Sequence, residues 1–393
     1  MKKILALVLA FVMVFALCGV AFADDDAEEI KIGLICLHDE NSGYDANFIN
    51  AFNAACEAAG VEGIIKTNIG ETADAYDAAC ELADAGCSVV ISDSYGHQSY
   101  ILEAANEYPD VQFTSCTGDM ALAEGVENYH NAFASIYEGR YLAGVAAGLK
   151  LNEMIENGDI TADEAKMGYV GAMTYAEVKS GYTSFYLGAK SVCPSVTMDV
   201  VFTGSWYDET LENEGATKLI QNGCVLISQH ADSMGAPNAC ETAMVPNVSY
   251  NGSTMEACPN TYIISSRINW EPYFAYIIEA VKNGENYDTD WCGTLETDSV
   301  ALTELNEAVA AEGTAEKLEE VKAALLDGSV KVFDTTTWTV GGETMEQAYA
   351  LDTDGDWVPD SEEAIHDGAF FESEYRSAPY FALDIDGIPL LDQ

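Results

Sequence analysis

Residues 31–35 read KIGLI and residues 166–170 read KMGYV, so one short apolar segment occurs twice in this chain. A second related pair follows at matching positions, GCSVVIS at 86–92 and GCVLISQ at 223–229. Within each half, helical patterns alternate with apolar runs of strand length. Such alternation predicts βαβ units around a parallel sheet. Because the unit occurs twice, we predict a bilobal α/β protein with a cleft between its lobes.

These patterns divide the chain into five expected segments. A strand and helix pattern at 131–150 is expected to carry the chain between the lobes, and a strand pattern at 262–270 to return it. The expected segments are a signal peptide at 1–23, a first α/β lobe at 24–134, a second α/β lobe with hinge crossovers at 135–270, a returning segment that completes the first lobe at 271–340, and an irregular acidic C-terminal extension at 341–393.

The N-terminus has the three parts of a secretory signal. Lys2 and Lys3 precede an apolar run at 4–17, and Ala-Phe-Ala at 21–23 offers a small-x-small cleavage site. The run is shorter than the roughly 20 apolar residues that span a bilayer. We therefore expect an exported protein, in the periplasm or at the cell surface. Lipidation of Cys18 is the alternative and would anchor the chain to the membrane.

Charge narrows the range of partners. The chain has 16 Lys and Arg against 66 Asp and Glu, a formal net charge of −50 at pH 7. Nucleic-acid binding needs clustered cations and is excluded. A phosphate or carboxylate ligand usually recruits arginine or a glycine-rich helix start. Arginine occurs only at 140, 267 and 376, outside the loops that follow the predicted strands. We expect a neutral or cationic ligand.

The loops after the predicted strands are the candidate binding site, because ligands of open α/β sheets bind beyond the carboxyl ends of the strands. These loops combine aromatic rings with amide, hydroxyl and carboxylate groups, which suits a flat, polar-edged, uncharged small molecule. Phe48 and Trp206 are expected in the site, because large rings at loop tips are costly unless a partner covers them. Asp45 and Asp208 each precede a helical pattern, so helix capping is an open alternative for them.

One acidic motif near the C-terminus has the ligand spacing of a calcium loop. Trp357 stands where such loops carry a turn glycine, so an acidic surface loop is the alternative. No cofactor is expected to be required, and a structural Ca²⁺ is the one metal considered. Its expected ligands are Asp352, Asp354, Asp356, Asp360 and Glu363.

Four segments together are typical of one family: IYEGRYLAG at 136–144, GSWYD at 204–208, QHADS at 229–233 and NWEPY at 269–273. In this order and spacing they resemble the basic membrane protein (BMP/PnrA-like) family of ABC-transporter substrate-binding proteins. The resemblance implies a type 1 periplasmic-binding-protein fold, whose two Rossmann-like lobes close on a purine nucleoside or purine base. It also implies an ABC permease in the membrane as partner, and we expect a monomer.

The resemblance also assigns site residues. It implies aromatic stacking by Phe48 and Trp206. Nucleoside-binding members usually carry an aspartate where Ser253 stands and a lysine about where Ile268 stands, so nucleoside and free base both stay open. Together with the strand-end loops, this gives the candidate ligand-binding residues Asp45, Asn47, Phe48, Ser94, Tyr95, Tyr175, Trp206, Asp208, Gln229, Asp232, Ser253 and Trp270.

The sequence therefore predicts a non-enzymatic receptor that supplies an ABC importer. It contains no nucleophile elbow, zinc-protease motif, phosphate loop or dinucleotide fingerprint. The alternative is a sensor of the same fold, for a sugar or another small molecule, that hands its closed state to a signalling partner.

Overall fold

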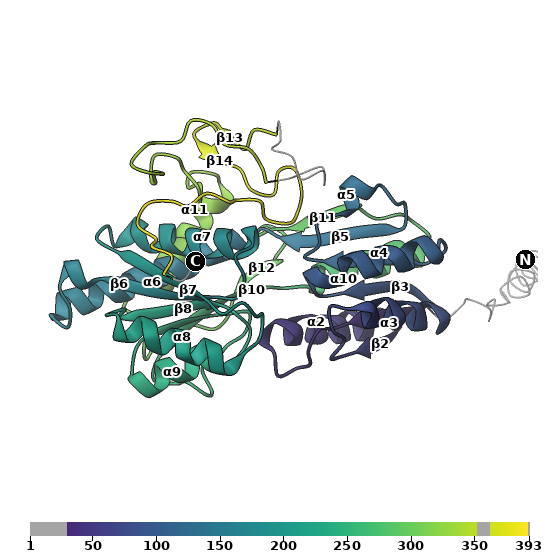
Figure 1. The fold of residues 1–393 in the computed structure, drawn as a ribbon, viewed down its shortest axis with the longest axis horizontal. Helices are drawn as coiled ribbons and strands as arrows, with labels where there is room; N and C mark the ends of the chain where they lie inside the picture. Colours follow the sequence, from purple (N-terminus) through teal and green to yellow (C-terminus); the bar gives the residue numbers. More distant parts are fainter. Residues whose placement is uncertain (1–29, 352–361, 392–393) are drawn as a thin grey trace, which may run out of the picture. The chain divides into compact units, whose positions relative to one another are not determined.

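The first of two central sheets consists of six parallel strands in the order β11-β5-β4-β3-β1-β2 (Figure 1). The computed structural model describes residues 30–351 and 362–391. Val89, Val90 and Ile91 of β3 are fully buried, as is typical of parallel strands that are covered on both faces. The strands are β1 (Lys31–Ile35), β2 (Glu62–Lys66), β3 (Cys87–Ser92), β4 (Gln112–Cys116), β5 (Tyr129–Ala134) and β11 (Asp290–Gly293), and the helices of this lobe are α2 (Gly43–Ala59), α3 (Ala73–Asp84), η1 (Tyr95–His97), α4 (Gln98–Glu107), α5 (Ala121–Glu124) and α10 (Glu271–Asn283).

The second sheet has the order β12-β10-β9-β8-β6-β7, and only the short strand β12 is antiparallel to its neighbour. The two sheets confirm the predicted bilobal α/β fold. The strands of the second lobe are β6 (Lys166–Gly171), β7 (Thr197–Phe202), β8 (Leu226–His230), β9 (Asn247–Tyr250), β10 (Tyr262–Ile268) and β12 (Val300–Leu302), and its helices are α6 (Ile136–Asn157), η2 (Ala162–Glu164), α7 (Ala176–Val192), α8 (Glu209–Gln221), α9 (Gly235–Ala243) and α11 (Thr314–Leu326).

The chain passes between the two sheets three times, after β5, after β10 and between β11 and β12. These crossovers are hydrogen-bonded to one another. The amide of Ser135 donates to the carbonyl of Gly293 at 2.7 Å, and the amide of Asn269 donates to the carbonyl of Ser299 at 2.8 Å. The three segments thus form one connected hinge.

The third crossover corrects part of the expected segment division. We expected residues 271–340 to complete the first lobe. Helix α10 contacts α2 and strand β11 pairs with β5, so both lie in the first lobe. Strand β12, however, pairs with β10, and α11 contacts α6, which places both in the second lobe. The short apolar strand β12 extends the sheet at β10, and this pairing takes the chain back to the second lobe.

Glycines allow α6 and α7 to approach very closely. A Cβ atom added at Gly144 would lie 2.0 Å from the carbonyl oxygen of Phe185, and one at Gly188 would lie 2.0 Å from that of Tyr141. Any side chain at either position would therefore push the helices apart. The close contact holds the N-terminal half of α6 over the second sheet, where α6 also contacts β10.

Residues 327–351 and 362–391 belong to an irregular C-terminal extension, and its described part contains one short hairpin, β13 (Ile365–His366) and β14 (Ala369–Phe370). The extension runs along the second lobe (Figure 1), where Leu390 forms a parallel bridge with Val200 at the outer edge of β7. A small aromatic core holds it together, in which Phe333 and Phe381 stack with ring centroids 4.5 Å apart. The edge of the second sheet is thereby covered.

Several expectations fall on residues outside the described ranges. The signal peptide at 1–23, Cys18, and four of the five expected calcium ligands, Asp352, Asp354, Asp356 and Asp360, lie there. The fifth, Glu363, is described, and its backbone carbonyl accepts a hydrogen bond from the hydroxyl of Tyr375 at 3.0 Å.

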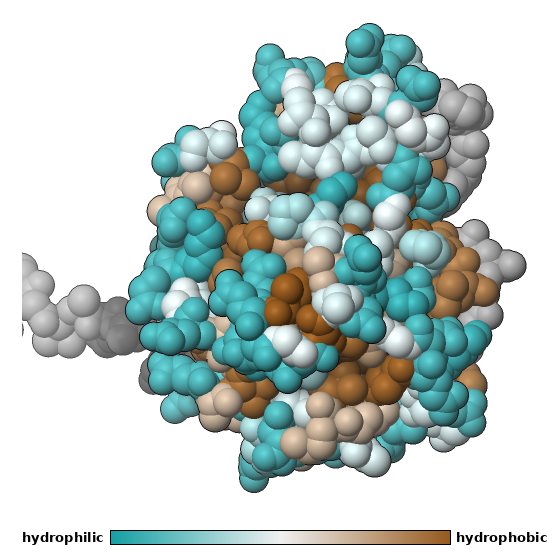
Figure 2. All heavy atoms as spheres, turned by 90° about the vertical axis from the view of Figure 1, so that its left-hand side faces the viewer, coloured by the Kyte–Doolittle hydropathy of each residue, from teal (hydrophilic) through white to brown (hydrophobic). Residues whose placement is uncertain are grey.

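The ten cysteines in the described part of the chain are all free thiols, and most are buried. No helix within the described residues is long and apolar enough to cross a bilayer. Figure 2 shows one face of the molecule, on which hydrophilic residues surround separate hydrophobic areas. A surface of this kind fits the strong acidity of the chain.

Candidate ligand-binding site

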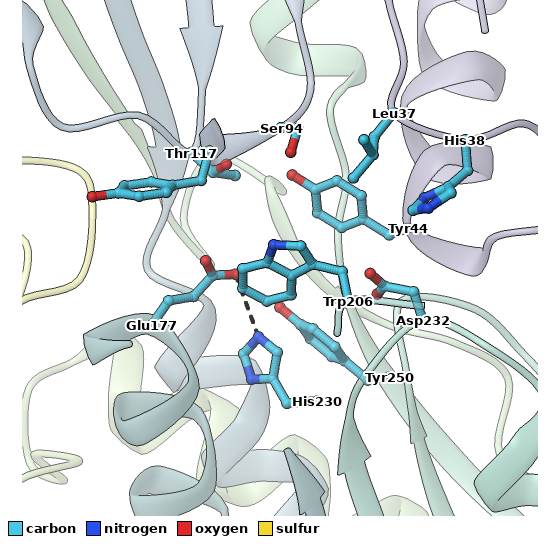
Figure 3. Close-up of a pocket in the computed structure, with 11 residues that line it drawn as sticks. Leu37, His38, Tyr44, Ser94, Thr117, Glu177, Trp206, His230, Asp232 and Tyr250 are labelled. Atoms are coloured by element: carbon cyan, nitrogen blue, oxygen red, sulfur yellow. Dashed lines mark hydrogen bonds and ion pairs between the residues drawn. The ribbon is translucent and has the colours of Figure 1, made fainter. Parts of the chain in front are cut away.

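A pocket lies between the two lobes, at the carboxyl ends of strands from both sheets (Figure 3). It encloses about 390 Å³ of empty space, part of which is open to solvent. The lining follows from strand order, because each contributing loop comes directly after a parallel strand. The residues that line it are Leu37, His38, Tyr44, Ser94, Tyr95, Thr117, Glu177, Trp206, His230, Asp232 and Tyr250.

Aromatic rings dominate the centre of the pocket. The rings of Tyr44, Trp206 and Tyr250 converge there (Figure 3), the first from the first lobe and the other two from the second. Tyr175 stands beside them, with its ring centroid 5.9 Å from that of Trp206 and 5.6 Å from that of Tyr95. Flat faces that come from both lobes can enclose a flat ligand when the lobes are closed.

Two carboxyl groups give the pocket its polar character. Burial raises the pKa of Asp232 well above its usual range, and the nearby carboxylates of Asp45 and Glu212 add to this effect. Glu177 lies 3.3 Å from Nε2 of His230, whose pKa is lowered by burial. Of the described residues that line the pocket, none is lysine or arginine. The site therefore favours a ligand that is neutral or cationic and that offers hydrogen-bond donors.

A buried arginine supports the pocket from behind. Arg140 of α6 is fully buried, and its guanidinium carbon lies 4.9 Å from the ring centroid of Tyr250. The guanidinium donates to groups on four strands of the second sheet: the Tyr169 hydroxyl at 2.8 Å, the Ser228 hydroxyl at 3.1 Å, the Gln229 carbonyl at 3.2 Å, the Ser266 hydroxyl at 3.3 Å and the Ser249 carbonyl at 3.4 Å. Arg140 thus fixes the strand ends that carry His230 and Tyr250.

The C-terminal extension forms the wall of a second cavity that adjoins the pocket. The two cavities share Tyr95, Thr117 and Glu177. The wall contributed by the extension consists of Leu351, Arg376, Ala378 and Pro379. An extension that the sequence placed outside the lobes therefore lies beside the site.

Four of the twelve expected site residues line the pocket: Ser94, Tyr95, Trp206 and Asp232. A fifth, Tyr175, contacts two of them through its ring and is 45% exposed. The strand-end rule was sufficient to find these five, because each belongs to a loop that directly follows a strand.

Phe48 and Trp270 lie elsewhere. They stack on each other with ring centroids 4.3 Å apart, and both are almost completely buried. Phe274 of α10 packs against Phe48 at 6.4 Å. The expected ligand stacker Phe48 therefore belongs to the core between α2 and α10, next to the hinge.

The remaining expected residues make contacts within the protein. The carboxylate of Asp208 accepts from the amide of Leu211 at 2.9 Å, which is the capping role left open for it. Ser253 donates to Glu304 at 2.7 Å, away from the pocket lining. Asn47 donates to the carbonyl of Asn251 at 2.8 Å and so links the lobes. Gln229 is buried behind the pocket, and Asp45 is described below.

Seven lining residues were not among the expected ones: Leu37, His38, Tyr44, Thr117, Glu177, His230 and Tyr250. Leu37, His38 and Thr117 lie just after β1 or β4, His230 and Tyr250 are the last residues of β8 and β9, and Tyr44 lies in the first turn of α2. Glu177 is the second residue of α7 and would have been found only by including the first helical turn.

Comparison with known proteins finds similar binding proteins, several of them named as parts of ABC transporters. A family model described as ABC transporter substrate-binding protein PnrA-like matches residues 38–332. A purine-binding protein of Brucella abortus is 29% identical over 88% of this chain and 96% of its own length. A putative ABC transporter glucose-binding protein of Haloferax volcanii is 32% identical over 57% of this chain and 54% of its own. A solute-binding protein of an ABC transporter system from Aeropyrum pernix has the same fold, with a TM-score of 0.65 at 18% identity over 77% of this chain and 93% of that one.

Proposed function

Because this chain belongs to the PnrA-like family of ABC transporter substrate-binding proteins, we propose that its cargo is a neutral purine, either a free base or a nucleoside, held in the pocket between the lobes. Substrate-binding proteins of ABC importers are extracytoplasmic, capture a small molecule and deliver it to a membrane permease. They are carriers and not enzymes. Ligand binding in such proteins shifts a population from open to closed lobes.

The composition of the pocket is the observation that supports a purine most strongly. A purine offers two flat faces and a polar edge with N–H donors. Tyr44, Trp206 and Tyr250 supply faces, whereas Glu177 and Asp232 supply carboxyl groups that can form hydrogen bonds with the polar edge. The absence of lysine and arginine from the described lining disfavours nucleotides, whose phosphates would need a cation. The Brucella relative that matches along nearly its whole length is a purine-binding protein.

The choice between base and nucleoside depends on groups that recognise ribose. Ser253 bonds to Glu304, and Ile268 is buried in β10 at 2% exposure. Neither position lines the pocket. A nucleoside would have to be held through its hydroxyl groups by other acceptors, so the proposal includes both ligands.

A sugar is the second candidate. Aromatic faces next to carboxylates also suit a sugar ring. The Haloferax relative, of which this chain matches 54%, is named as a putative glucose-binding protein. A sensor that binds a sugar and passes its closed state to a signalling protein belongs to the same alternative.

Equilibrium dialysis with labelled adenine, adenosine and glucose separates these candidates. The purine proposal predicts that adenine or adenosine is retained by the protein and is not displaced by excess glucose. Retention of glucose that adenine does not displace would support the sugar. The Trp206→Ala variant provides the control for binding outside the pocket.

A further inference from the structure

Two buried carboxyl groups lie next to each other directly behind the pocket. Asp93 follows β3, and Asp45 stands in the first turn of α2; both residues are 0% exposed. One carboxylate oxygen of each and Sγ of Cys36 lie within 4.8 Å of one another. Two buried carboxylates at this separation cannot both be ionised without a large electrostatic penalty.

Hydrogen bonds account for three of the four carboxyl oxygens. Oδ1 of Asp93 accepts from the amide of Leu37 at 3.0 Å, and Oδ1 of Asp45 accepts from the amide of His38 at 2.7 Å. Oδ2 of Asp45 accepts from the hydroxyl of Ser42 at 2.5 Å. Oδ2 of Asp93 is buried and has no hydrogen-bond partner among the described residues. An orphan oxygen beside a second carboxylate is where a shared proton would lie.

The groups that face the pair supply little positive charge. They are the thiols of Cys36 and Cys116, the hydroxyl of Tyr44, the imidazoles of His38 and His97, and, from the second lobe, the carboxyl of Asp232. Nδ1 of His38 lies 3.4 Å from Oδ2 of Asp45, at the edge of the pair. Within residues 30–351 and 362–391, the groups found to act on the Asp93 carboxyl are neutral or acidic.

The pKa values of the two carboxyl groups are shifted in opposite directions. Burial, followed by the charge of Asp45, raises the pKa of Asp93 well above its usual range. Burial also acts to raise the pKa of Asp45, but hydrogen bonds from His38 and Ser42 outweigh it and lower that pKa. Asp45 is therefore the ionised member and Asp93 the protonated one.

We propose that Asp93 is protonated and that its Oδ2–H group donates a hydrogen bond to the carboxylate of Asp45. This hydrogen bond positions the first-lobe side of the ligand pocket. The residues held by the pair are pocket residues. The backbone amides of Leu37 and His38 donate hydrogen bonds to the carboxyl groups of the pair. The hydroxyl of Tyr44 donates to the backbone carbonyl of Asp93 at 2.5 Å. The positioning role rests on the proposed function, whereas the shared proton does not.

Loss of this proton would disturb the site. Ionised Asp93 would place a second negative charge against Asp45, and the two segments 36–45 and 93–95 would move apart. Asparagine at position 93 reproduces the protonated state at every pH, since its amide group donates to Asp45 and its carbonyl accepts from Leu37. Asp93→Asn therefore keeps the hydrogen bond to Asp45 at every pH and cannot become negatively charged.

The first test measures thermal unfolding of the ligand-free protein from about pH 5 to about pH 9. A carboxyl whose pKa is raised by folding binds more protons in the folded state, so its contribution to stability falls as pH rises above its ordinary value. Asp93→Asn is expected to unfold at a higher temperature than the wild type at neutral pH, with an advantage that grows with pH. The exposed neighbour Glu40→Gln is the matched control and is expected to show no such trend.

Two outcomes of this test would overturn the shared proton. One is an Asp93→Asn variant that is less stable than the wild type by the same amount at every pH, which would mean that an ionised Asp93 is needed. The other is an unfolding temperature that EDTA lowers in the wild type but not in Asp93→Asn, which would assign the pair a metal cation. The expected result is that EDTA acts equally on both proteins.

The second test measures adenine binding at about pH 6 and about pH 9. The wild type is expected to lose roughly tenfold in affinity, which corresponds to a pKa of Asp93 that is about one unit higher in the ligand-bound than in the free protein. Asp93→Asn is expected to keep its affinity within about twofold. Equal losses in both proteins would overturn the positioning role. A wild type that binds adenine at neither pH would exclude adenine as the ligand, and the unfolding test would still decide the proton.

Discussion

The hydroxyl and the backbone amide of Ser377 both donate hydrogen bonds to the carboxylate of Asp290, at 2.5 and 2.6 Å. Ser377 belongs to the C-terminal extension, and Asp290 opens β11 in the first lobe. Nearby in the extension, Glu372 accepts from the hydroxyl of Ser180 on α7 in the second lobe. The extension is thus attached to both lobes and bridges the mouth of the cleft.

Because the extension is attached to both lobes, opening must break at least one attachment, such as the contact of Ser377 with Asp290 or that of Glu372 with Ser180. We expect Ser377→Ala to release ligand about tenfold faster than the wild type, because it removes one hydrogen bond to a charged group, worth about 1.5 kcal/mol. Stopped-flow tryptophan fluorescence measures the release rate. Ser329→Ala removes an exposed hydroxyl elsewhere in the extension and is the control. Equal release rates for all three proteins would show that the bridge does not restrain opening.

Trp206 and Trp270 are expected to respond in opposite ways. Trp206 lines the pocket, so Trp206→Ala should weaken ligand binding at least about tenfold with little effect on unfolding. Trp270 is buried against Phe48, so Trp270→Ala should lower the free energy of unfolding by about 3–5 kcal/mol. Calorimetric titration and urea unfolding of both variants measure the two effects. A large loss of stability in Trp206→Ala would contradict its placement.

Arg140 is expected to be structural in spite of its place behind the pocket. Arg140→Met keeps the bulk of the side chain but removes the donor from oxygen acceptors on four strands. We expect urea unfolding to show a loss of roughly 2–4 kcal/mol, since each buried acceptor without a donor costs about 1–3 kcal/mol. Arg267→Met, at a partly exposed position of β10, is the control. A fully stable Arg140→Met variant would refute the role assigned to this network.

Buried glutamates give stability a particular pH dependence. Burial raises the pKa of Glu138, Glu212 and Glu372 to about 7 in each case. These groups bind more protons when the protein is folded, so their contributions to stability are lost as pH rises from about 4.5 to about 7. Unfolding temperatures measured across this range should fall toward neutral pH, and Glu212→Gln should reduce the slope. A slope that Glu212→Gln leaves unchanged would contradict the assignment for this residue.

Much of the architecture could be predicted from sequence because it depends on periodic patterns. The repeated segments at 31–35 and 166–170 are β1 and β6, which take equivalent places in the two sheets. Strand pairing across a long connection leaves no such local signal. The three residues of β12 join the second sheet, and no pattern within 300–326 predicted that the chain returns there.

The site could be predicted only in part, for a related physical reason. Strand order brings loop residues such as Ser94 and Asp232 to one edge, and that rule needs only the sequence. Whether a ring points into the cleft or into the core depends on its neighbours in space. Phe48 finds Trp270 as a stacking partner and is buried, whereas Tyr44, four residues earlier, faces the pocket.

Calorimetric titration of the purified protein with adenine, guanine, hypoxanthine, their nucleosides, AMP and glucose tests the central claim most directly. We predict saturable binding of at least one base or nucleoside with one molecule bound per chain, no binding of AMP, and loss of the signal in Trp206→Ala. A folded protein that gives no heat with any of the purines, or that binds only glucose, would contradict the claim that the pocket between the lobes holds a neutral purine.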